Sequence, residues 1–201
     1  MLCDAAPDNI AAEMRHDDAA AADAAFQAAA HVVALDLVNQ RLAPASMEPR
    51  VVLAEPEAGS GRLVITLSSQ MPTAVRDGVA ASLGLPKEQV RVLVGDVGGG
   101  FGMKTGLYPE DIVVAHAARA LQRPVKWCAQ RLEEFSASVH GRDVVTRAEL
   151  ALDANGKVLA LRTRSYANVG GYAMTVGVAI QLLIGPWVST SIYDIPVISL
   201  H

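Results

Sequence analysis

The sequence has 201 residues, 51% hydrophobic and 19% charged, which is enough apolar material for one globular domain or two small ones. The formal net charge of -4 and the lack of any Lys/Arg block argue against nucleic acid or an anionic membrane surface as the main partner. The two cysteines, Cys3 and Cys128, provide neither a disulfide framework nor the roughly four thiolates that an iron–sulfur cluster needs.

The first half of the chain is expected to mix helices and strands. In chain order, the pattern predicts a helix over 17–30, strands over 31–42 and 62–67, a helix over 72–84 and a strand over 89–94. The second of these helices is well delimited, because Pro72 suits a first turn and Gly84 follows the last turn. Val75 and Val79 lie four residues apart, so they are expected on one buried face.

The second half begins with the clearest helix signal in the chain. The pattern predicts a helix over 108–121, a strand over 124–128, and a hairpin of strands 144–152 and 157–166 around the turn "DANG". The face expected to be buried on the helix consists of Ile112, Val113, His116, Ala117, Ala120 and Leu121. These elements predict an α+β fold, a mixed sheet with helices packed on it. No linker composition occurs, so residues 1–201 are expected to form a single unit.

Targeting signals are weak. The chain begins with acidic residues where a secretory signal would carry Lys or Arg, so a cytoplasmic location is expected. The most apolar run, residues 172–188, is interrupted by glycines and Pro186. It is therefore expected to form a buried helix or loop rather than a membrane span.

The stretch "GDVGGGFGMK", residues 95–104, predicts a loop that brings bare backbone close to a ligand. It fits neither nucleotide motif. Met103 stands where a P-loop requires glycine before the lysine, and it also occupies the third glycine position of a dinucleotide fingerprint that starts at Gly98. A loop that only packs a strand against a helix, and a phosphate-binding domain that departs from these motifs, remain alternatives.

Several blocks together resemble one family. "DVGGGFGMK" is followed by "YPEDIVVAHAARALQRPVKW" and "HGRD", and is preceded by "NQRLAPASMEPR" and "SSQMP". In this order they are similar to the molybdenum-binding large subunit of the xanthine dehydrogenase, aldehyde oxidase and carbon monoxide dehydrogenase family. The resemblance implies a molybdopterin cofactor, with or without an attached nucleotide, whose molybdenum oxidatively hydroxylates an aldehyde, a heterocycle or a similar small substrate.

The resemblance also implies roles for individual residues. Gln70 matches the glutamine whose amide hydrogen-bonds an oxygen ligand of the metal, and Gly99 and Gly100 leave space for the cofactor. Phe101 and Gly102 approach the molybdenum through their backbone, so no side chain of this chain is expected to bind the metal. Thr105 stands where members that oxidise purines carry a glutamate, which argues against purine substrates. Met103 replaces a residue that is often smaller, which would reshape the approach to the metal.

Other polar residues are expected to be structural. A buried anchor is the alternative for Phe101, and a solvated or capping side chain is the alternative for Gln70. Lys104 is expected to be a solvated or helix-end charge. His116 and His140 have no second ligand at metal-binding spacing. Glu48 and Glu110 are expected to hold turns or cap a helix rather than act as bases.

The family's large subunit is several times longer than 201 residues, and its catalytic glutamate lies beyond the matching region. No catalytic residue is therefore expected in this chain, which is interpreted as a fragment of a larger molybdopterin-binding domain, inactive or barely active alone. Its partners would be the remainder of the subunit and subunits or regions that carry iron–sulfur clusters and FAD. The alternative is a non-catalytic module, truncated or from a split gene, that packs against a partner chain.

Overall fold

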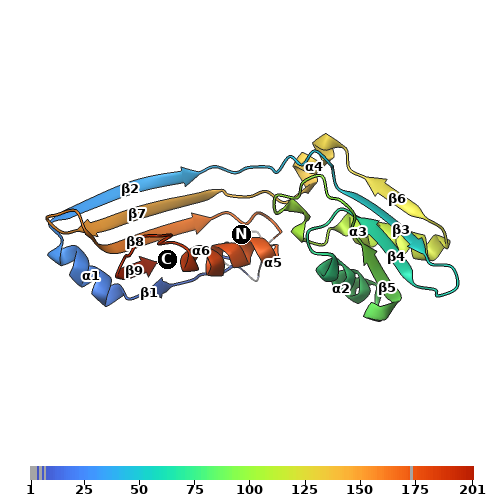
Figure 1. The fold of residues 1–201 in the computed structure, drawn as a ribbon, viewed down its shortest axis with the longest axis horizontal. Helices are drawn as coiled ribbons and strands as arrows, with labels where there is room; N and C mark the ends of the chain where they lie inside the picture. Colours follow the sequence, from blue (N-terminus) through green and yellow to red (C-terminus); the bar gives the residue numbers. More distant parts are fainter. Residues whose placement is uncertain (1–3, 5, 7, 173) are drawn as a thin grey trace. The chain divides into compact units, whose positions relative to one another are not determined.

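The computed structural model describes residues 4, 6, 8–172 and 174–201 (Figure 1). The chain divides into two compact units, one formed by Met1–Leu42 with Arg142–His201 and the other by Ala43–Gly141. Each unit has its own mixed β-sheet with helices, so the predicted α+β class is confirmed, with two sheets in place of one. That the two units act together as one domain stays a prediction.

The unit Ala43–Gly141 contains a four-stranded sheet in the order β5-β4-β3-β6. Its strands are β3 (Val51–Pro56), β4 (Leu63–Leu67), β5 (Val90–Leu93) and β6 (Val125–Cys128). Its helices are α2 (Pro72–Leu83), α3 (Pro109–Leu121) and α4 (Arg131–Ala137), with short 3-10 turns η1 (Lys87–Gln89) and η2 (Met103–Thr105). Strand β4 runs parallel to β5 and antiparallel to β3, and α2 makes the crossover that a parallel pair requires.

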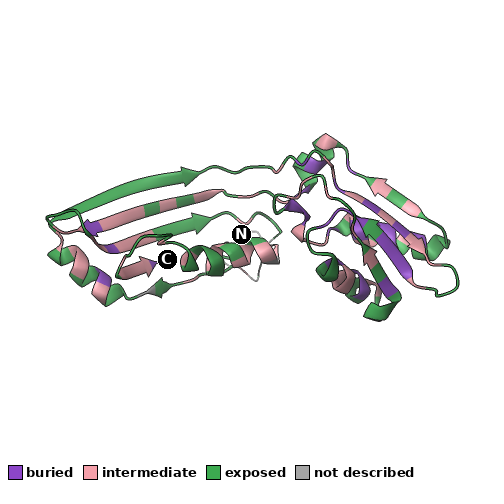
Figure 2. Ribbon diagram, viewed as in Figure 1, coloured by how far each residue is buried: buried purple, intermediate pink, exposed green. Residues whose placement is uncertain are grey.

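The hydrophobic core of this unit lies between the sheet and helices α2 and α3 (Figure 2). Helix α2 confirms the prediction: Val75 and Val79 are buried, and Gly84 ends the helix in the left-handed conformation that glycine adopts at low cost. Helix α3 forms as predicted, but the predicted face is wrong. Val113 and Leu121 are exposed, and the buried residues are Asp111, Val114, Ala115 and Ala118.

The other unit contains a five-stranded sheet in the order β1-β9-β8-β7-β2. Its strands are β1 (His16–Asp17), β2 (His31–Asn39), β7 (Val144–Leu152), β8 (Val158–Ala167) and β9 (Val197–Leu200). Its helices are α1 (Ala19–Ala28), α5 (Thr175–Ala179), a π-helical turn η3 (Ile180–Ile184) and α6 (Gly185–Trp187). The predicted hairpin is confirmed by β7 and β8. The apolar run is helical over residues 175–187, but Ile180, Leu183 and Trp187 are exposed, so the expectation of a buried segment is wrong. Within the described ranges, no helix is long and apolar enough to cross a membrane.

Candidate functional site

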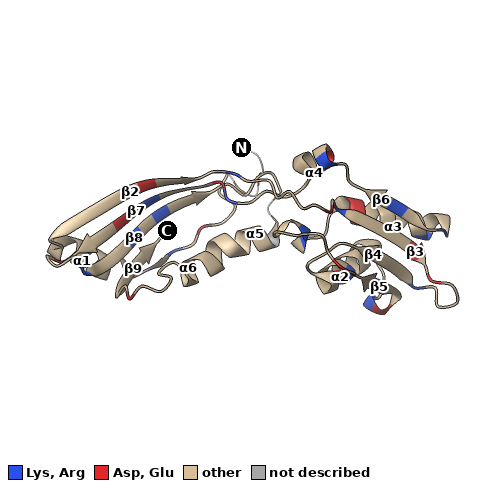
Figure 3. Cartoon of the chain, turned by 45° about the horizontal axis from the view of Figure 1, so that its top comes forward, with Lys and Arg blue, Asp and Glu red and all other residues tan. Residues whose placement is uncertain are grey.

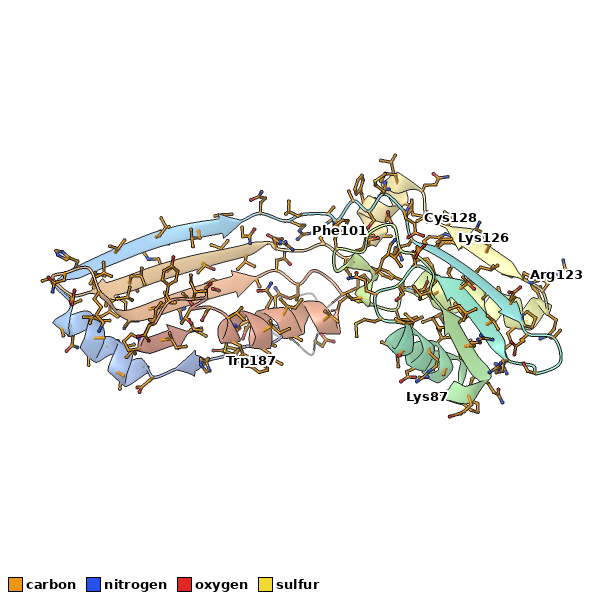
Figure 4. The ribbon with its side chains drawn as sticks, viewed as in Figure 1. Lys87, Phe101, Arg123, Lys126, Cys128 and Trp187 are labelled. Carbon is orange, nitrogen blue, oxygen red and sulfur yellow. The ribbon has the colours of Figure 1, made fainter. Side chains whose placement is uncertain are left out.

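The glycine loop, residues 95–102, leaves the end of β5 and enters the turn η2 ahead of helix α3. Gly99, Phe101 and Gly102 all have positive φ angles, of 101°, 50° and 85°. A phenylalanine rarely adopts this conformation, so its neighbours must hold it there. Phe101 is 71% exposed on the loop (Figure 4), and the alternative of a buried anchor is therefore wrong.

Gln70, which directly precedes Met71 and helix α2, holds the C-terminal part of the loop. Its side-chain oxygen accepts hydrogen bonds from the backbone N–H of Gly102 at 3.1 Å and of Lys104 at 3.2 Å. Its own backbone N–H donates to the carbonyl of Lys104 at 2.8 Å. Because both side-chain partners are donors, the accepting atom must be the amide oxygen. The amide nitrogen of Gln70 then retains both hydrogens without a partner among the described residues.

Two glycines are required by the side chains that pack against the loop. A Cβ atom on Gly100 would lie 2.5 Å from the side-chain amide carbon of Gln70, and one on Gly98 would lie 2.5 Å from Cβ of Glu48. Any larger residue would therefore push Gln70 or Glu48 away. Gly100 thus has a reason to be glycine within the chain itself, and the clearance for a cofactor at Gly99 and Gly100 stays a prediction.

Glu48 and Lys104 form a second support for the loop, close to its N-terminal part. The Lys104 ammonium donates to the Glu48 carboxylate at 3.0 Å and to the Glu48 backbone carbonyl at 2.9 Å. The same carboxylate oxygen accepts the Gly98 N–H at 2.9 Å, and the Glu48 N–H donates to the Gly98 carbonyl. The Lys104 side chain is fully buried, so the expectation of a solvated lysine is wrong. Glu48 holds a turn, as predicted.

Burial and hydrogen bonding act on Glu48 in opposite directions. Burial raises the pKa of its carboxyl group, while the hydrogen bonds from Lys104 and from Gly98 lower it. The net pKa of Glu48 lies below its ordinary value of 4.5. The carboxylate is therefore ionised at neutral pH, as both hydrogen bonds require.

Behind the loop, Arg50 and Tyr108 fix the backbone of Met103. The Tyr108 hydroxyl donates to the Met103 carbonyl at 2.7 Å. The Arg50 guanidinium lies 3.8 Å from the centre of the Tyr108 ring and pairs with Glu110 at 3.3 Å. Glu110 therefore has a structural role, as predicted. Sequence reasoning missed Arg50 and Tyr108, because no local pattern distinguishes a buried arginine from a solvated one.

The remaining polar residues of the predicted site have local partners. Thr105 donates its hydroxyl to the Gly102 carbonyl at 2.7 Å, so both backbone groups of Gly102 are engaged. The N–H of Phe101 has no partner in the described part of the chain. His140 contacts the Phe135 carbonyl at 2.9 Å, and His116 is exposed. Among the described residues, no three His, Cys, Asp or Glu side chains group together as a metal site.

Comparison with known proteins identifies the family to which this chain belongs. Residues 2–201 match the family model of the molybdopterin cofactor-binding domain, so the chain belongs to this family. More particularly, it is similar to large subunits of molybdenum hydroxylases, and the resemblance inferred from its motifs is confirmed.

Two curated relatives and one solved structure show the extent of the match. The chain is 36% identical to the carbon monoxide dehydrogenase large chain of Hydrogenophaga pseudoflava, over 77% of this chain and 19% of that one. It is 33% identical to the nicotine 6-hydroxylase large subunit of Paenarthrobacter nicotinovorans, over 87% of this chain and 22% of that one. Quinoline 2-oxidoreductase from Pseudomonas putida 86 superposes with a TM-score of 0.83 at 33% identity, and the match covers 92% of this chain and 24% of that one. The chain thus spans about a fifth of the length of the curated relatives it matches.

The ion pair between Glu48 and Lys104 predicts that removing either partner lowers the free energy of unfolding by a different amount. Glu48→Ala leaves the fully buried Lys104 ammonium without its carboxylate, and the free energy of unfolding should fall by about 3 kcal/mol. Lys104→Met keeps the apolar stem and leaves a carboxylate that is 33% exposed and can be hydrated, so the loss should be only about 1 kcal/mol. Urea unfolding of both variants measures this difference, and a larger loss in Lys104→Met would contradict it.

The lowered pKa of Glu48 predicts that acid weakens the loop. A depressed pKa adds stability that is present above 4.5 and is lost as the pH falls through the lower value of the folded state. The NMR signal of the Gly98 amide, which reports the hydrogen bond to Glu48, should therefore titrate with a midpoint below 4.5. The signal should not titrate there in Glu48→Gln. A midpoint at or above 4.5 in the unmodified protein would show that the carboxylate is not stabilised.

Proposed function

We propose that this chain forms one wall of the molybdopterin cofactor site in the large subunit of a molybdenum hydroxylase. The orientation of Gln70 is the observation that carries the proposal. Its amide oxygen accepts hydrogen bonds from Gly102 and Lys104, so the amide nitrogen keeps two hydrogens without a partner among the described residues, on a residue that is exposed. A neutral amide suits an oxygen ligand of a metal, because it donates a hydrogen bond without itself titrating or becoming a ligand.

The loop fits such a group in two further respects. Apart from Gly102 itself and its two chain neighbours, no described residue has an atom within 4 Å of the position that a Cβ on Gly102 would take, so the backbone is open there. The N–H of Phe101 is a second donor left without a partner in the described residues, and it is presented by a strained backbone. Because both hydrogen-bonding groups of Gly102 are engaged within the chain, Phe101 rather than Gly102 would offer its backbone N–H to the cofactor.

When bound, the molybdenum of this cofactor supplies the oxygen transfer and the electron acceptance that no side chain can perform. The chain's own residues would hold and orient the cofactor, and none of them is assigned a catalytic role. The catalytic base, a glutamate in the family, would come from polypeptide outside these residues. Electrons would pass to iron–sulfur and flavin groups on other regions or subunits, since two cysteines cannot hold a cluster.

The substrate would be an aldehyde, a heterocycle or a similarly small molecule. Support comes from the relatives, which are named for oxidation of carbon monoxide and hydroxylation of nicotine, and from quinoline 2-oxidoreductase. Thr105 uses its hydroxyl to hold Gly102, and it offers no carboxylate to orient a purine. The form of the pterin and a cytoplasmic location stay predictions.

A conservative variant of Gln70 separates its two roles, which are to accept hydrogen bonds from the loop and to donate one to the cofactor. Gln70→Glu keeps an oxygen that can accept from Gly102 and Lys104, but it replaces the donor with a second acceptor. We expect the loop to remain folded and the molybdenum content of the assembled large subunit to fall about tenfold or more. Metal analysis measures the content, and the melting temperature of the cofactor-free protein is the control. Full molybdenum content in Gln70→Glu would remove the Gln70 amide from the site.

A further inference from the structure

The sheet of the unit Met1–Leu42 with Arg142–His201 has few fully buried apolar side chains. Among its described residues, the buried apolar side chains are Ala22, Ala151, Ala160 and Leu200. Three of these are alanines, which contribute little apolar area, whereas the other unit buries a cluster of valines, leucines and isoleucine. Ordering the backbone costs free energy at every residue, so this sheet would gain stability from apolar contacts beyond those in its own unit.

Strand β2 shows most clearly where those contacts are missing. It is the last strand of the sheet, and all nine of its residues, His31–Asn39, are exposed (Figure 2). Successive residues of a strand point to opposite faces, so Val33, Leu35 and Leu37 share one face and Val32 and Val38 share the other. Their exposed fractions range from 45% to 73%. Both faces and the free edge of β2 are therefore open.

The apolar surface continues from β2 onto its neighbours. Val38 pairs with Val145 of β7, and Val145 pairs with Tyr166 of β8, so the three residues form a row on one face. All three are at least half exposed. We call Val32, Val38, Val145 and Tyr166, with Val33, Leu35 and Leu37 on the opposite face, the β2 surface. Contiguous exposed apolar side chains are a mark of contact sites on protein surfaces.

The edge of β2 carries few of the features that keep a free edge from pairing. Residues 31–39 include no lysine, arginine, proline or glycine, and Figure 3 shows the strand almost without charge. Its one acidic residue, Asp36, is already paired with Arg147 at 2.7 Å. By contrast, the edge strands of the other sheet, β5 and β6, have four residues each and carry Arg91 and Lys126. The β2 edge is therefore suited to pair with another strand.

We infer that the β2 surface is the docking site for the remainder of the large subunit, which would add a strand to the edge of β2 and cover its apolar faces. The inference rests on the proposed function in one respect, namely that the chain works as part of a large subunit. The chain spans about a fifth of the large subunits it matches, so polypeptide corresponding to the other four fifths is the occupant. Strand addition satisfies the free backbone groups, and apolar side chains from the same polypeptide bury the two faces.

Hydrogen exchange tests the inference directly on cofactor-free protein. The partner is the large-subunit polypeptide encoded next to the coding sequence of residues 1–201, either in the same reading frame or as a separate gene. We expect the amides of residues 31–39 to exchange about tenfold or more slowly in the assembled subunit than in the chain alone. Unchanged exchange in the assembled subunit would overturn the inference. Absence of any such neighbouring polypeptide would overturn it as well, and so would equal protection by self-association of the chain.

A matched pair of variants locates the contact. Val33→Asp places a charge on the β2 surface, and Val113→Asp places the same charge on the exposed side of α3 in the other unit. Val33→Asp should weaken assembly, measured as a dissociation constant or as the yield of co-purified subunit, by about tenfold or more. Val113→Asp should weaken it less. Equal weakening by the two variants would overturn the placement at β2. Because no cofactor is needed, a failure here is distinct from a failure of the Gln70 experiment.

Discussion

Two side-chain acceptors hold a loop whose backbone would not otherwise keep its shape. Gln70 binds the N–H groups of Gly102 and Lys104, and Glu48 binds the Gly98 N–H and the Lys104 ammonium. The glycines are what allow these side chains to approach, because a Cβ on Gly98 or Gly100 would displace them. The loop therefore depends on Gln70 and Glu48 for its shape, and these two side chains depend on the glycines for the space they occupy. The positive φ of Phe101 persists because both sides of the loop are fixed.

Lys104 connects the two supports. Its backbone groups bind Gln70, while its buried ammonium binds Glu48, so one residue ties the glutamine to the glutamate. The arrangement fixes the Gln70 amide in one orientation. Arg50 and Tyr108 extend it through the carbonyl of Met103 to helix α3 and to the paired Glu110. The outcome is a preorganised donor at the surface of a well-packed unit, which is what an oxygen-bearing cofactor would need.

The two units differ in what they need from other polypeptide. The unit Ala43–Gly141 carries the glycine loop on a core of its own, in which residues such as Ile65 and Val79 are fully buried. The other unit has a longer sheet but leaves β2 open on both faces. In the proposed assembly, the first unit would keep the geometry of the site, and the second unit would contact the rest of the large subunit.

Local sequence patterns predicted most elements but few of the tertiary contacts. Pro72 and Gly84 delimit α2 because their backbone preferences act locally, and "DANG" marks the β7–β8 turn for the same reason. Strand β3 and helix α4 were not predicted, since "VVLAEP" includes Glu55 and Pro56 and α4 has only seven residues. On α3, mostly small residues face the core, because close packing rather than hydrophobicity decides which side of this helix is buried.

The family blocks pointed to Gln70 and the glycines, whose roles toward a cofactor stay predictions. They gave no sign that Lys104 supports the loop, because lysine side chains are usually exposed. The partner of Lys104 is Glu48, 56 residues earlier in the chain, and only the fold brings the two together. The same holds for Arg50 and Tyr108.

The most direct test of the proposed role of Gln70 is a crystal structure of the assembled, molybdenum-loaded subunit. We expect the Gln70 oxygen still to accept from the Gly102 and Lys104 N–H groups while the Gln70 amide nitrogen donates to the cofactor. A Gln70 side chain turned away from the cofactor, or a glycine loop that contacts no part of it, would contradict the proposed cofactor site.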